Sequence, residues 1–154
     1  IVEPTIVAID AHLPIIDHDV VYDSHKNEGY LYNHSGYGLR VTEKPKGLKR
    51  VRSKDTLLTF IQIAQQLMLI QSKETGEFLT VSRRGKLSST FLATEGSLWR
   101  MEKKSSHKKF QSLTNKSTDC TLSINRRGNV RCRRGATKRS TSFITISRRS
   151  NRRF

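Results

Sequence analysis

Cysteine and proline are scarce in this sequence of 154 residues, which contains two cysteines and three prolines. Two cysteines are too few for a disulfide scaffold or a zinc site, and the five histidines follow no metal-binding spacing. No apolar run approaches the length needed to span a bilayer. No paired carboxylates, Ser-His-Asp set or phosphate-binding glycine loop points to catalysis. We therefore expect a protein without metal or cofactor that is neither an enzyme nor embedded in a membrane.

Acidic residues are also scarce, and they are unevenly distributed along the chain. Residues 1–29 carry a net charge of −5, residues 30–102 carry +6, and residues 103–154 carry +15 with a single acidic residue. The total of +16 predicts an anionic partner that binds the last third of the chain. DNA, RNA, a sulfated polysaccharide and an acidic membrane surface all fit this charge.

A repeat of about forty residues organises the sequence. Three segments each contain two alternating apolar residues, a polar turn with glycine and a second short strand, a pattern typical of a β-hairpin. They are GLRVTEKPKGLK (38–49), FLTVSRRGKLSS (78–89) and TLSINRRGNVRC (121–132), with turn glycines Gly47, Gly85 and Gly128.

A further set of strands follows the three hairpins at nearly constant distance. Phe60, Trp99 and Phe143 lie 13, 14 and 15 residues after the three turn glycines. The strands of this set are TLLTFIQIA (56–64), SLWRMEKK (97–104) and TSFITISRR (141–149), and LMLIQ (67–71) and KFQSL (109–113) complete the first two units. About a dozen short strands in three units predict an all-β protein of the β-trefoil type, a six-stranded barrel capped by three hairpins. A β-sandwich is the alternative, but it gives no reason for a threefold repeat.

The expected organisation has three parts. Residues 1–29 form a partly irregular N-terminal arm, residues 30–147 form the trefoil core, and residues 148–154 form a basic tail. The arm shows no convincing helical or strand period.

From about Tyr30 to Ile146 the sequence resembles the fibroblast growth factor family. The resemblance rests on LYNHSGYGLRV (31–41), on TLLTFIQIA with LMLIQSKETGEFLTVSRRGKL (67–87), and on TLSINRRGNVRCRRG followed by TSFI, in that order. It implies a secreted ligand that binds a receptor tyrosine kinase ectodomain with heparan sulfate. The ligand would be a monomer alone, and dimerisation on heparan sulfate with the receptor stays open.

The resemblance also implies which residues bind these partners. Tyr32, Ile144 and Ile146 correspond to receptor contacts, although core packing is an equal alternative for the two isoleucines, and a receptor-facing acidic position of the family is Met101 here. The third hairpin and the loop after it correspond to the heparin site. The residues carried over are Asn125, Arg126, Arg127, Arg131, Arg133, Arg134, Lys138 and Arg139.

The residues of this hairpin support that assignment. Strand alternation places Arg131 and Arg133 on one side and Cys132 on the other, with Arg126 and Arg127 at the tip. Arginine binds sulfate through charge-assisted hydrogen bonds. The alternative is a solvated charged loop.

The two cysteines flank the NRRGN turn and can face each other across the hairpin. A bridge between Cys120 and Cys132 would stabilise the fold by about 3 kcal/mol and suit an oxidising compartment. Two reduced thiols are the alternative. The sequons at Asn33 and Asn115 make these residues candidate N-glycosylation sites and are compatible with secretion.

Three functions therefore remain open: an extracellular signalling ligand, which we favour, an intracellular basic β protein that binds nucleic acid, and a growth-factor homologue that is not secreted. Arg-Gly pairs occur in RNA-binding segments, but no aromatic residues interleave with these arginines.

Overall fold

The fold is a closed β-barrel with three hairpins. The computed structural model describes residues 13–49, 52–104, 107–134 and 141–148. Six strands pair in an antiparallel ring in the order β1, β4, β5, β8, β9 and β12, and β12 returns to β1. These barrel strands are β1 (His25–Asn33), β4 (Leu58–Ala64), β5 (Leu67–Ser72), β8 (Leu98–Lys104), β9 (His107–Asn115) and β12 (Phe143–Ser147).

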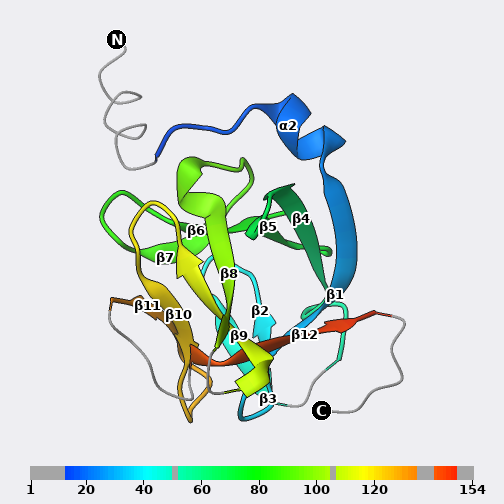
Figure 1. Cartoon of the computed structure of the whole chain (residues 1–154), viewed down its shortest axis with the longest axis vertical. Coiled ribbons are helices and arrows are strands. Elements are labelled where there is room, and N and C mark those ends of the chain that lie inside the picture. The colour runs from blue at the N-terminus through cyan, green and yellow to red at the C-terminus, as the bar shows by residue number, and fades with distance from the viewer. Residues whose placement is uncertain (1–12, 50–51, 105–106, 135–140, 149–154) are drawn as a thin grey trace.

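Three two-stranded hairpins attach to this ring, one from each repeat (Figure 1). They are β2 (Tyr37–Arg40) with β3 (Lys46–Lys49), β6 (Phe78–Val81) with β7 (Leu87–Thr90), and β10 (Thr121–Ile124) with β11 (Val130–Arg133). A six-stranded barrel with three hairpins is a β-trefoil. The sequence-based prediction of the fold class is confirmed.

Equivalent hydrogen bonds recur in all three repeats. The backbone nitrogen of His34 donates to Ser142 at 2.9 Å, that of Lys73 to Leu57 at 3.0 Å, and that of Lys116 to Leu98 at 3.0 Å. In each case the residue after a barrel strand bonds to the residue that begins, or immediately precedes, another barrel strand. The sequence repeat is therefore a repeat of tertiary contacts.

The core fills the barrel and the space beneath the hairpins. Phe60, Trp99 and Phe143, the three residues at matching places in the repeats, belong to one buried cluster. The indole nitrogen of Trp99 donates to the carbonyl of Leu79 at 3.0 Å, so the largest core side chain leaves no polar atom unsatisfied. Apolar burial of this extent is the main stabilising contribution to the fold.

The segment of residues 13–24 is more regular than its sequence predicts. It contains the short helix α2 (His18–Asp23), capped by the Asp17 carboxylate, which accepts from the Asp19 nitrogen at 2.9 Å. Ile16 and Val21 pack on a second buried cluster around Phe78 and Leu98. The barrel strand β1 begins at His25, so the ordered fold extends into the stretch that we assigned to an arm.

The segment crosses the end of the molecule that carries the 3-10 helix η1 (Glu95–Ser97) (Figure 1). The backbone nitrogen of Ile16 donates to Ala93 at 2.8 Å, and that of Glu95 donates to Pro14 at 2.8 Å. The β10–β11 turn lies at the opposite end in the same view. No helix among the described residues is long and apolar enough to cross a membrane.

Candidate functional site

The third hairpin is shaped by the turn between β10 and β11. The side-chain oxygen of Asn125 accepts hydrogen bonds from the backbone nitrogens of Arg127 at 2.9 Å and Asn129 at 3.0 Å. Gly128 has a φ of +79°, a conformation that residues with a Cβ rarely adopt. Asn125, which the sequence places in the heparin site, thus uses its side-chain oxygen to fix the turn.

Arginines occupy the outer surface of this hairpin. Along β11, Arg131 and Arg133 are exposed while Val130 and Cys132 are half-buried and pack on the core, as strand alternation predicts. Arg126 and Arg127 are exposed at the turn. In the described part of the chain, none of these four arginines forms an ion pair. Their positive charges are therefore available to an anion.

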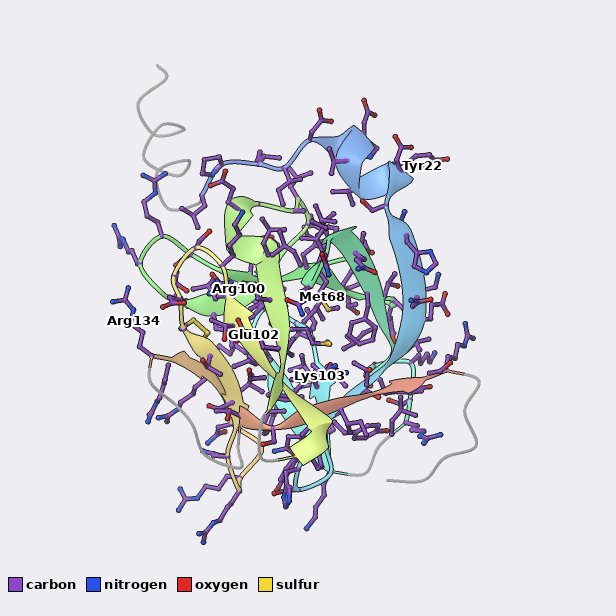
Figure 2. All side chains as sticks on the ribbon, in the orientation of Figure 1. Tyr22, Met68, Arg100, Glu102, Lys103 and Arg134 are labelled. Carbon is purple, nitrogen blue, oxygen red and sulfur yellow. A yellow bond between two sulfur atoms is a disulfide. The ribbon has the colours of Figure 1, made fainter. Side chains whose placement is uncertain are left out.

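Arg134 lies at the other end of the hairpin. Its Nε donates to the carbonyl of Thr118 at 3.2 Å, and its side chain points away from the body of the molecule (Figure 2). The basic surface therefore continues along the hairpin from the turn to this end. Lys138 and Arg139, which the sequence adds to the same set, lie outside the described residues.

A disulfide joins Cys120 and Cys132 with their Cα atoms 5.2 Å apart. Cys132 pairs with Leu122 across the hairpin, and Cys120 lies directly before β10. The predicted bond is therefore present, and it closes the end of the hairpin that is opposite the turn. The half-buried Cys132 thereby anchors β11 between Arg131 and Arg133.

The turn of the third hairpin is also attached to the first repeat. The Gly47 nitrogen donates to the Gly128 carbonyl at 2.8 Å, and the Tyr37 hydroxyl donates to the Arg126 carbonyl at 2.5 Å. The side-chain nitrogen of Asn33 donates to the carbonyl of Ile124 at 3.0 Å. These contacts hold the basic turn in place. The sequence repeat did not predict them, because it shows which residues are equivalent and not how the repeats pack against one another.

The three candidate receptor residues lie on the neighbouring strands β1 and β12, where Tyr32 pairs with Ile144. Tyr32 is 1% exposed and Ile146 is 3% exposed, whereas Ile144 is partly exposed. Burial raises the pKa of the Tyr32 phenol, and a hydrogen bond with Arg52 partly opposes that rise. Tyr32 and Ile146 are therefore mainly core residues, and Ile144 alone offers appreciable side-chain surface.

Ile146 nevertheless borders a surface hollow of about 390 Å³. Phe60, Met68 and Met101 form its other apolar lining, and Glu28 is at its rim. Met68 is labelled in Figure 2 near the centre of that view. We did not predict Met68 as a site residue, because a single methionine in a strand has no distinguishing pattern.

An ion-pair network stands beside this hollow. Glu28 binds Arg148 at 2.6 Å and Lys73 at 3.1 Å. The hydrogen bond from Arg148, followed by the one from Lys73, lowers the pKa of the Glu28 carboxyl. The carboxylate is therefore charged at neutral pH and holds two cations next to the hollow.

The two sequon asparagines have structural roles. Asn33 and Asn115 are 1% and 0% exposed. The Asn115 side-chain nitrogen donates to the carbonyl of Gly96 at 2.9 Å, and its oxygen accepts from the backbone nitrogens of Ser117 and Thr118 at 3.2 Å. A glycan on either amide nitrogen has no room in this fold, which argues against their use as N-glycosylation sites.

Comparisons with known proteins agree with the geometry. The family model described as fibroblast growth factor matches residues 27–145. No curated protein gave a significant match. Two solved structures are similar in fold: SeviL bound to asialo-GM1 saccharide, with 17% identity and a TM-score of 0.69, and a BEL β-trefoil in an apo crystal form, with 13% identity and a TM-score of 0.70. The matches cover 80% and 79% of this chain and 99% and 92% of the other chains.

Proposed function

The chain belongs to the fibroblast growth factor family, and we propose that it is a secreted ligand that binds and activates a receptor tyrosine kinase ectodomain with heparan sulfate as co-receptor. Members of this family are signalling ligands, not enzymes. The observation that carries the proposal is the row of exposed arginines, without ion-pair partners among the described residues, on a hairpin held by a disulfide.

The chemistry of heparan sulfate suits this hairpin. Its sulfates and carboxylates are fixed anions spaced along a chain, and arginine binds such groups by charge-assisted, often bidentate, hydrogen bonds. A rigid platform loses less conformational entropy on binding than a flexible loop. The disulfide and the contacts of Gly128 and Arg126 with the first repeat provide that rigidity.

The receptor surface that we propose combines Ile144 with the hollow between Met68, Met101 and Ile146. Tyr32 is buried and pairs with Ile144 on the neighbouring strand, so it supports Ile144 and is not itself a contact. Methionines at the edge of a hollow adapt their shape to an apolar side chain of a partner. The absence of a carboxylate at Met101 makes this part of the surface more apolar than the family pattern.

Secretion is supported by the disulfide, because such bonds form and persist in oxidising compartments. The disulfide thus supports the proposal that the protein acts outside the cell. A non-secreted homologue would be expected to hold Cys120 and Cys132 reduced. Mass measurement of the protein isolated from its source, with and without thiol alkylation, distinguishes the two states.

The deciding experiment measures binding of the purified chain to fibroblast growth factor receptor ectodomains with and without heparin. We expect a complex that forms more tightly with heparin and receptor phosphorylation on intact cells. Tight RNA binding together with no heparin-dependent receptor complex would overturn the proposal in favour of a nucleic-acid-binding protein.

A matched pair of variants places the sulfate site. Replacing Arg126, Arg131 and Arg133 by alanine should shift elution from heparin to much lower salt. The control replaces Arg83, Arg84 and Lys86, which are exposed on the equivalent hairpin of the second repeat and carry the same total charge. Equal shifts in both variants would show that net charge, and not this hairpin, determines heparin binding.

A further inference from the structure

Three exposed or half-exposed residues form a row across the first and third hairpins. In the β2–β3 pairing Arg40 is directly opposite Lys46, and Lys46 in turn forms an isolated antiparallel bridge with Asn129. Residues paired across neighbouring strands project to the same face. The side chains of Arg40, Lys46 and Asn129 therefore share one surface, while Gly47 faces the opposite way into contact with Gly128.

This row continues the arginine surface of β11. Asn129 alternates with Val130, and the exposed residues that follow at steps of two are Arg131 and Arg133. Since successive side chains of a strand alternate between faces, Asn129, Arg131 and Arg133 share one face. Lys46 pairs with Asn129 and therefore lies on the same face. The first repeat thus adds two cations to the surface of the third.

Two features of this row indicate an anion that completes it. Arg40 and Lys46 are like charges directly opposite each other, an arrangement that is destabilising by itself. The Nε atom of Arg40 is buried and has no hydrogen-bond partner in the described part of the chain. An unsatisfied buried donor is unfavourable. A sulfate bound between Arg40 and Lys46 would neutralise the repulsion, and a shift of the Arg40 side chain toward it would bring Nε within reach of a sulfate oxygen.

We propose that the sulfated-polysaccharide site extends from β11 across Asn129 onto Lys46 and Arg40 of the first hairpin. The inference rests on the proposed function, because it assigns further contacts to the same ligand. A chain bound in this way crosses two repeats instead of lying along one hairpin. The contact of Gly47 with Gly128 and that of Tyr37 with Arg126 keep the two halves of the site in register.

Heparin affinity of the full chain as a function of salt tests the proposal. Lys46→Gln should weaken binding by about three- to tenfold near physiological salt and reduce the slope of log affinity against log salt by about one. Lys86→Gln is the matched control, since Lys86 is an exposed lysine near the turn glycine of the second hairpin. It should leave the slope nearly unchanged.

A second variant tests the role of the buried nitrogen. Arg40→Lys keeps the charge but removes Nε and the guanidinium plane, so we expect weaker heparin binding with an unchanged far-ultraviolet circular dichroism spectrum. Binding equal to that of the wild type would remove Arg40 from the site. Thermal unfolding of each variant, with and without heparin, separates loss of ligand contact from loss of fold.

The outcomes distinguish this inference from the proposed function. If replacing Arg126, Arg131 and Arg133 weakens heparin binding while Lys46→Gln behaves like Lys86→Gln, the extension is wrong and the hairpin site stands. If the wild type fails to bind heparin, both fail. If Lys46→Gln reduces the affinity and the salt slope while Lys86→Gln does not, the site spans two repeats.

Discussion

The backbone nitrogen of Gly47 and the carbonyl oxygen of Gly128 are 2.8 Å apart, and this hydrogen bond joins strand β3 of the first hairpin to the turn of the third. Neither residue has a side chain, which permits the approach. A Cβ on Gly128 would lie 2.6 Å from the Gly47 oxygen, and one on Gly47 would lie 2.7 Å from Ile124 Cγ2. Gly128 therefore serves tertiary contact as well as turn geometry. Gly47, which the sequence pattern places in a turn, lies instead in β3, where it pairs with Leu39 and serves tertiary contact.

Gly128→Ala should accordingly destabilise the protein by more than a turn glycine normally does. The residue has a φ of +79°, so alanine costs about 1–2 kcal/mol for its backbone, and the contact with Gly47 adds about 1–3 kcal/mol. Urea unfolding measures this loss. Heparin affinity should fall in parallel because the two halves of the basic platform separate.

The second repeat provides a matched control. Gly85 has a φ of +83°, but a Cβ there would meet no atom within 4 Å. Gly85→Ala should therefore lose only the backbone contribution and keep heparin affinity. Equal losses of stability in the two variants would contradict a special role for the contact between Gly47 and Gly128.

Reduction of the disulfide should weaken the third hairpin selectively. Opening the bond between Cys120 and Cys132 should lower the free energy of unfolding by about 3 kcal/mol, mainly through greater freedom of the unfolded chain. The double variant with serine at both positions avoids the need for reductant. For amides that exchange by local opening, hydrogen exchange should accelerate more in β10 and β11, the strands that the bond closes, than in β4 and β5. A larger acceleration in β4 and β5 would contradict the assignment.

The repeat made the fold predictable from the sequence. Gly47, Gly85 and Gly128, each followed by an aromatic residue at a nearly constant distance, define three units that cannot bury their apolar faces alone. The disulfide and the outward arginines of β11 followed from local geometry, namely a hairpin and strand alternation. All of these depend on residues close in sequence.

Contacts between distant residues were not predictable in the same way. The row from Arg40 through Lys46 to Asn129 depends on how the hairpins dock, which no local pattern encodes. Strand alternation alone did not predict that Ile146 is buried. In the closed barrel Ile146 pairs with Tyr30 of β1, and its burial depends on this packing between strands distant in sequence. The six-residue helix α2 is too short to show a helical period.

Asn115 should prove essential for stability and should carry no glycan. Asn115→Ala leaves the carbonyl of Gly96 and two backbone nitrogens without partners, so we expect a loss of about 2–4 kcal/mol in unfolding free energy. Asn27→Ala, at an exposed asparagine of β1, should change stability by less than about 0.5 kcal/mol.

Mass spectrometry of protein secreted from eukaryotic cells should find Asn33 and Asn115 unmodified, and occupancy at either site would contradict their burial.

Glu28 should make stability depend on pH in the acidic range. Its pKa is lowered in the folded state by Arg148 and Lys73 from an ordinary value of 4.5, so its stabilising effect is complete above that pH and is lost as the pH falls through the folded-state value. Glu28→Gln should be less stable than the wild type near neutral pH by under about 1 kcal/mol, because the ion pairs are exposed. The difference should shrink toward acidic pH and at high salt.

Chemical unfolding between neutral and acidic pH measures this difference in unfolding free energy, with Glu74→Gln as the control at an exposed glutamate outside this network. A difference that stays constant with pH would show that the carboxylate charge contributes nothing to the fold.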